Sequence, residues 1–129
     1  MIGSNAFNYI NVLNKAANAT LTRYDVIANN IANNDTPNYK RQDVQFESYL
    51  KSALSDGGSL DKAVDNADLN SLDPTIYTDN ADLSYRLDGN NVDMETEQTY
   101  LADSQIRYYA LLDSMSQEFG RIKTVLSAR

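Results

Sequence analysis

Apolar and small side chains recur at helical spacing in the first third of the chain. Alternating steps of three and four residues, as in a coiled-coil seam, connect Ile10, Leu13, Ala17, Thr20, Tyr24, Ile27 and Ile31. Leu21 and Ala28 widen this stripe, and asparagine dominates the opposite face. Because asparagine has weak helix propensity, we expect a helix that forms fully only against a partner. It should end near Asn33-Asn34, before Pro37.

The last third of the chain repeats this pattern. Its stripe comprises Leu101, Gln105, Tyr108, Leu112, Met115, Phe119, Ile122 and Leu126, with Gln105 as the single polar break. Asp93 is the expected N-cap, and Glu95 and Glu97 place negative charge in the first turn, where the helix dipole favours it. The two stripes predict a mainly α fold, with two long terminal helices paired as an antiparallel coiled coil and a small irregular or β middle region.

The middle of the chain lacks a long stripe. Residues 44–54 predict a short helix, which the Gly57-Gly58 pair ends. Residues 60–80 hold few apolar anchors, so we expect a flexible or irregular loop there. A short strand is expected where Leu83, Tyr85 and Leu87 alternate with polar residues, before a turn at Asp88-Gly89-Asn90. We therefore divide the chain into residues 1–34, 35–90 and 91–129.

Four apolar residues lie off the two seams: Val12, Val26, Leu111 and Val125. The middle of the chain offers little core to cover them, so we expect them to meet neighbouring subunits. Burial of each could contribute about 1.5–3 kcal/mol. The pattern favours a non-catalytic assembly subunit, and the core of an ordinary helical hairpin is the alternative.

Composition excludes most catalytic chemistry. The chain has no cysteine and no histidine, which removes thiol nucleophiles, imidazole bases and the usual zinc ligands. An EF-hand alignment ending at Glu95 fails because it puts Arg86 at a ligand position. Four glutamates are interpreted as solvent-facing or helix-end charges: Glu47, Glu95, Glu97 and Glu118. We expect no enzyme activity, no cofactor and no metal.

The charge and hydropathy of the chain limit the classes of partner that we expect it to bind. Of the net charge of -7, the segment 41–90 carries -6, from four Lys/Arg against ten Asp/Glu. An acidic surface without a basic stripe repels nucleic acid. The mean hydropathy is -0.52 and the apolar runs are only a few residues long, which predicts no lipid-spanning segment and no cleaved leader.

The most specific segment is Ala28-Asn29-Asn30-Ile31-Ala32-Asn33-Asn34-Asp35-Thr36-Pro37-Asn38-Tyr39-Lys40. A helix exit explains its turn residues but not the dense asparagines, which suit a polar interface between subunits. The segment resembles the N-terminal motif of the flagellar basal-body rod, hook and hook-associated family, in which a similar helix leads to Thr-Pro-x-Tyr. The short length and the segments 46–54, 89–97 and 105–108 are similar to a proximal rod member of that family.

This resemblance implies a structural subunit of the proximal rod of the bacterial flagellar basal body. Such a subunit would leave the cytoplasm unfolded through the flagellar type III secretion system and polymerise outside the cytoplasmic membrane into the drive shaft that transmits torque. Its terminal helices would order on assembly. The implied partners are further copies, other rod proteins, a FliE-like adaptor, the MS ring and the export gate. A helical-hairpin adaptor or secretion chaperone, or another short proximal rod protein, is the alternative.

The stripes and the asparagine-rich segment together predict the assembly interface. Its expected members are Ile10, Leu13, Leu21, Tyr24, Ile27, Asn29, Asn30, Ile31, Asn33, Thr36, Pro37, Tyr39, Tyr108, Leu112, Met115, Phe119, Ile122 and Leu126.

Overall fold

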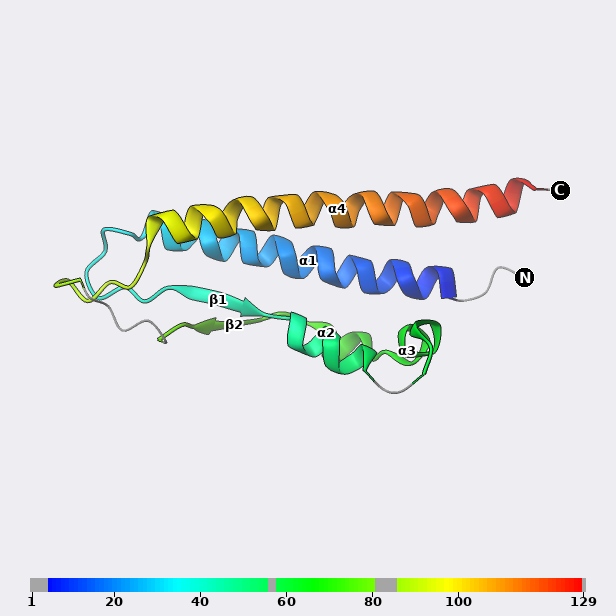
Figure 1. The fold of residues 1–129 in the computed structure, drawn as a ribbon, viewed down its shortest axis with the longest axis horizontal. Coiled ribbons are helices and arrows are strands. Elements are labelled where there is room, and N and C mark those ends of the chain that lie inside the picture. Colours follow the sequence, from blue (N-terminus) through cyan, green and yellow to red (C-terminus); the bar gives the residue numbers. More distant parts are fainter. Residues whose placement is uncertain (1–4, 56–57, 81–85, 129) are drawn as a thin grey trace.

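The fold consists of two long antiparallel helices and a small middle layer (Figure 1). A computed structural model describes residues 5–55, 58–80 and 86–128. The elements are α1 (Asn5–Ala32), β1 (Gln42–Gln45), α2 (Glu47–Leu54), α3 (Leu60–Asn66), the 3-10 turn η1 (Leu69–Leu72), β2 (Thr75–Thr78) and α4 (Met94–Ser127). In Figure 1, α1 lies between α4 and the layer formed by the strands and short helices. The predicted mainly α fold with two paired terminal helices is confirmed.

Both long helices begin or end where the local chemistry requires it. The Asp93 side chain accepts hydrogen bonds from the backbone N–H groups of Glu95 (3.0 Å) and Thr96 (3.4 Å), so the predicted N-cap of α4 is confirmed. Helix α1 ends at Ala32, as the asparagine run predicted, and the Asn33 amide closes the last turn on the Asn29 carbonyl at 3.1 Å.

The main core lies between α1 and the middle layer. Its members are Val12, Ala16, Ala19, Val26, Val44, Phe46, Val64 and Leu72. Helix α1 therefore buries two faces, one against α4 and one against this layer. The prediction that Val12 and Val26 meet neighbouring subunits is wrong, because the middle layer of the same chain covers both. Leu111 also packs against this core, whereas Val125 is exposed.

Residues 60–80 form ordered structure, which corrects the predicted irregular loop. Ser59 caps α3 and Asp68 caps η1, and Leu72 is completely buried. Val64 and Leu72 of this segment are buried in the core and Leu69 packs against it, so a small number of apolar residues suffices to hold the segment on α1. Strand β2 pairs antiparallel with β1, with Val44 opposite Ile76.

The remaining middle elements differ in detail from expectation. The short helix predicted for residues 44–54 begins only at Glu47, because Val44 belongs to β1. The strand predicted around Leu83 and Tyr85 lies outside the described residues, and Leu87 is fully exposed in the turn before α4. The division into three domains at residues 34 and 90 stays a prediction. Among the described residues, we find no helix with the combined length and hydropathy that a membrane crossing requires.

Candidate assembly site

Polar residues converge at the end of the helix pair where α1 stops and α4 starts. We call the set Asn30, Tyr39, Arg41, Asp79, Asn90 and Glu97 the polar hub. Arg41 is at its centre: Nε donates to Glu97 Oε1 and Nη1 donates to Asp79 Oδ2, both at 2.5 Å. The Glu97 side chain is only 1% exposed and that of Arg41 8%. Since α4 carries Glu97 and Arg41 directly precedes β1, this pair fixes the helix to the sheet.

Asn30 joins three elements through one side chain. Its Nδ2 donates to the Gln42 carbonyl at 2.8 Å and to Glu97 Oε2 at 3.1 Å. Its Oδ1 accepts from the Tyr39 hydroxyl at 3.0 Å and from the Gln42 amide at 2.9 Å. Asn30 is completely buried, and an amide side chain has four such hydrogen-bonding positions. The full use of all four fixes α1, β1 and α4 relative to one another.

The Asn90 side chain caps the C-terminal end of α1. Its Nδ2 lies 2.8–3.0 Å from the carbonyl oxygens of Asn33, Asn34 and Thr36, and its Oδ1 accepts from the Val92 amide at 2.7 Å. The carbonyls at a helix C-terminus lack partners within the helix. The residue that satisfies them therefore also places the segment leading into α4.

Two turns interlock beside Asn90. Gly89 has a φ of 77° and Asn38 a φ of 60°, both in the left-handed region, and the Asn38 amide donates to the Asp88 carbonyl at 2.7 Å. A Cβ atom on Gly89 would lie 2.5 Å from Asn38 Oδ1. The glycine is therefore required both for its backbone conformation and for the close approach of the two turns.

The electrostatics of the hub favour the ionised form of Arg41. Burial opposes its charge, but the hydrogen bond and charge of Glu97, together with Asp79 and Asp43, outweigh this and raise the pKa of Arg41. Burial also raises the pKa of the Tyr39 hydroxyl, and the charge of Glu97 adds to that effect. Among the described residues, every buried side-chain nitrogen and oxygen has a hydrogen-bond partner. The hub is thus a saturated structural network.

Sequence reasoning did not find the ion pair of the hub. We interpreted Glu97 as a solvent-facing or helix-end charge. It does lie in the first turn of α4, but it does not face solvent, because its side chain is buried against Arg41. The partners are 56 residues apart, so no local spacing connects them. One signal was available: Glu97 lies four residues before Leu101, a spacing that places both residues on the same side of a helix.

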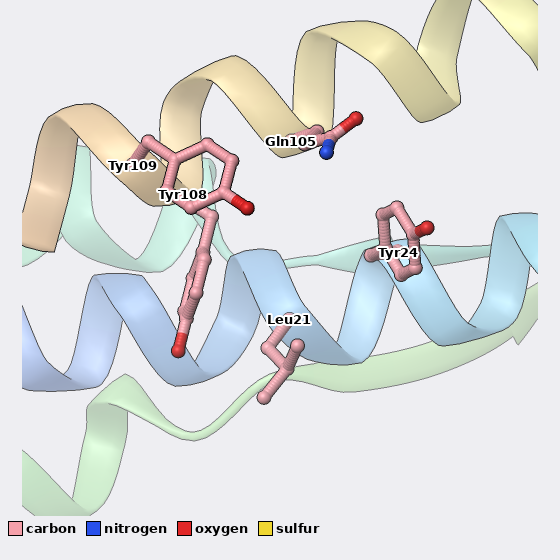
Figure 2. Close-up of a pocket in the computed structure, with 5 residues that line it drawn as sticks. All are labelled: Leu21, Tyr24, Gln105, Tyr108 and Tyr109. Carbon is pink, nitrogen blue, oxygen red and sulfur yellow. The ribbon is translucent and has the colours of Figure 1, made fainter.

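The other part of the helix pair has an open, apolar surface. A hollow of about 190 Å³ lies between α1 and α4, lined by Leu21, Tyr24, Gln105, Tyr108 and Tyr109. Figure 2 shows Tyr108 extending from α4 across α1, with Tyr24 directed from α1 toward α4. The centroids of the rings of Tyr108 and Tyr109 are 6.1 Å apart. Tyr109 is 61% exposed. This surface can accept an apolar group from outside the chain.

The predicted interface residues fall into three classes of exposure. Three are buried within the chain: Ile10, Ile27 and Asn30. Eight are partly buried: Leu13, Tyr24, Ile31, Asn33, Tyr39, Tyr108, Met115 and Ile122. Seven are exposed: Leu21, Asn29, Thr36, Pro37, Leu112, Phe119 and Leu126. Their role in assembly stays a prediction, and the exposed class is the one that a partner can reach without unfolding the subunit.

Comparison with known proteins supplies the family. Residues 10–40 match the family model described as flagella basal body rod protein. The flagellar basal body rod protein FlgB of Bacillus subtilis strain 168 is 41% identical over 103 residues, covering 79% of this chain and 80% of that protein. FlgB of Escherichia coli K12 is 33% identical over 127 residues, with 88% and 89% covered. FlgB of Borrelia hermsii is 31% identical over 131 residues, with 94% and 92% covered.

Proposed function

This chain belongs to the flagellar basal body rod protein family, and we propose that it is a structural subunit of the proximal rod. The observation that carries the proposal is the similarity to FlgB proteins along nearly the whole chain, including both long helices. The similarity places the chain in the bacterial flagellar basal body. There the subunit assembles with other rod and basal body proteins, and its relatives are structural proteins rather than enzymes.

The finer parts of the proposal concern its route and its neighbours. We infer that the subunit is exported by the flagellar type III secretion system and joins further copies of itself and other rod proteins outside the cytoplasmic membrane. A FliE-like adaptor, the MS ring and the export gate are its neighbours at the base. The rod transmits torque, and the chain contributes no catalysis of its own.

The geometry gives this role a physical basis. Torque must pass through a subunit without changing the relative positions of its helices. The polar hub holds α1, β1 and α4 together by directional hydrogen bonds and the Arg41–Glu97 ion pair. Leu112, Phe119 and Leu126 remain exposed on α4 and are available for contacts between subunits. Rigid connection inside the subunit and adhesive surface outside it are what a rod subunit requires.

A substitution on the exposed face tests the proposal in cells. In the native host, Leu112→Asp places a charge on the apolar face of α4 at a position that is 40% exposed. The subunit should be made at normal levels, because the side chain still reaches water, but cells should lack rods and should not swim in soft agar. Gln117→Asp, an exposed position about 140° further around the helix, is the matched control and should swim.

The outcomes of these experiments distinguish a rod subunit from an adaptor or a chaperone. Normal rods in Leu112→Asp cells would show that this face does not serve assembly. Complete basal bodies in a strain lacking the gene would show that the chain is not a rod component and would favour an adaptor or chaperone. Ile27→Asp is a less selective probe: Ile27 is 1% exposed inside the subunit, so this change disrupts folding as well as assembly.

A further inference from the structure

Helix α4 keeps large apolar side chains exposed along roughly its last four turns. Among its described residues, only Glu97 and Ser104 are buried, and both lie in its first third. Beyond them, Leu112, Phe119, Val125 and Leu126 are all at least 40% exposed. Several large apolar side chains at one end of one helix indicate an interaction surface.

The hollow between α1 and α4 has the size and lining to receive such a side chain. Its volume of about 190 Å³ is enough for one large apolar group, and Leu21 and Tyr109 form two of its exposed walls (Figure 2). Gln105 adds a single polar group. An apolar side chain entering the hollow from another molecule would bury the aromatic walls as well as itself.

The end of α4 cannot fill this hollow in its own chain. Helix α4 is continuous to Ser127, and Leu126 lies 17 residues beyond Tyr109 on the same helix. At a rise of about 1.5 Å per residue, this separation is roughly 26 Å. The end of α4 can therefore occupy this hollow only when it comes from another molecule.

Charge favours a second copy of the chain as that molecule. Residues 120–129 carry three basic side chains and no acidic ones, whereas residues 1–119 carry eight basic and eighteen acidic ones, or -10. Asp25, next to Tyr24 at the hollow, is exposed. The basic end of one copy is therefore attracted to the acidic body of the next, and such attraction accelerates and orients association.

We propose that the hollow lined by Leu21, Tyr24 and Tyr109 is the docking site for the end of α4 from a second copy. The docked element is the apolar face that carries Phe119 and Leu126. The donating and accepting surfaces are different parts of the molecule, so the contact is heterologous and can repeat as an open series of subunits. This inference rests on the proposed rod function and specifies which surfaces of two copies meet.

Engineered disulfides test the contact directly, because the chain contains no cysteine. The full chain with Tyr109→Cys is mixed with a chain carrying Phe119→Cys or Leu126→Cys and oxidised mildly. We expect the mixed disulfide dimer to form on the order of tenfold or more faster than with Gln117→Cys in place of Tyr109→Cys, as burial of one large apolar side chain implies. Raising the ionic strength from about 0.05 M to about 0.5 M should slow it.

Three results would overturn the docking proposal. The first is a yield of mixed disulfide dimer that is no higher with Tyr109→Cys than with Gln117→Cys, whether the other chain carries Phe119→Cys or Leu126→Cys. Another is faster disulfide formation between two Tyr109→Cys chains than in the mixture, which would indicate a symmetric contact. The third is full reactivity when Leu21→Asp is added to the Tyr109→Cys chain, because Leu21 is already 43% exposed and a charge there should block the hollow while the subunit stays folded.

Isolated basal bodies distinguish failure of the docking proposal from failure of the proposed function. Here one chain carries Tyr109→Cys together with Phe119→Cys or Leu126→Cys. If it is recovered in basal bodies but forms no disulfide between position 109 of one copy and position 119 or 126 of another, the docking proposal is wrong and the rod function stands. If the disulfide forms with purified protein but the chain is absent from basal bodies, the rod function is wrong and the contact stands.

Discussion

The two ends of the helix pair differ in the kind of contact that their side chains make. At one end, the polar hub uses directional bonds, and among the described residues its buried polar atoms are all satisfied. At the other end, α4 presents large apolar side chains to solvent, and its polar contacts are short-range pairs within the helix, such as Arg121 with Glu118. Hydrogen bonds specify one geometry. Apolar contacts are non-directional, so an exposed apolar face can pack against a partner after the subunit has folded.

This difference shows how one chain can be both rigid and adhesive. A buried ion pair contributes little net stability compared with an apolar replacement, but breaking it is costly, so it mainly excludes other arrangements. We infer that the hub fixes the register of α1 and α4. The register in turn brings Leu21 and Tyr24 next to Tyr108, and thereby creates the hollow midway along the helix pair.

The largest effect on the free subunit should come from Arg41→Met. This change leaves Glu97, whose side chain is 1% exposed, without its cation, and it also removes a partner of Asp79. The free energy of unfolding should fall by about 3–5 kcal/mol, measured by urea denaturation. Arg121→Met, which breaks a pair with a 73% exposed arginine at the open end, should cost less than about 1 kcal/mol. Equal losses would contradict the contrast between the two ends.

Two glycines should respond with opposite signs. Gly89→Ala, in the hub, forces a Cβ toward Asn38 Oδ1 and a φ of 77° on alanine, so we expect a loss of about 1–3 kcal/mol. Gly120→Ala, in the open half of α4, has no atom within 4 Å of the new Cβ and should stabilise the helix by about 0.5–1 kcal/mol. Thermal unfolding of both variants measures this, and the same sign in both would be inconsistent with the structure.

The smallest expected effect is a pH dependence of folding stability, which comes from the Arg23–Glu47 pair at the edge of the middle layer. The hydrogen bond from Arg23 lowers the pKa of Glu47 below its ordinary value of 4.5. A lowered pKa in the folded state means that its contribution is present above pH 4.5 and is lost as the pH falls through the folded value. The urea midpoint of the native chain should therefore drop toward that of Glu47→Gln between pH 5 and pH 3, by roughly the small amount typical of exposed pairs. A difference between the two that persists at pH 3 would argue against this pairing.

Local patterns in the sequence predicted the long helices and their ends. The stripe from Ile10 to Ile31, the N-cap Asp93 and the turn at Gly89 all depend on neighbours within a few residues, and the structure agrees with each. The order of residues 60–80 was missed, because Val64 and Leu72 gain their burial from α1, more than 30 residues away. The hub was missed for the same reason: Asn30 and Glu97 look like surface residues until the fold brings them together.

Amide hydrogen exchange of the free subunit and of the assembled rod tests the central claim most directly. In the free subunit, amides of α4 from Gln98 to Ser104, near the hub, should exchange at least tenfold more slowly than those from Leu112 to Ser127. On assembly, the second group should gain protection while the first changes little. Uniform protection along α4 in the free subunit, or new protection only around the hub, would contradict a fixed polar end joined to an open apolar one.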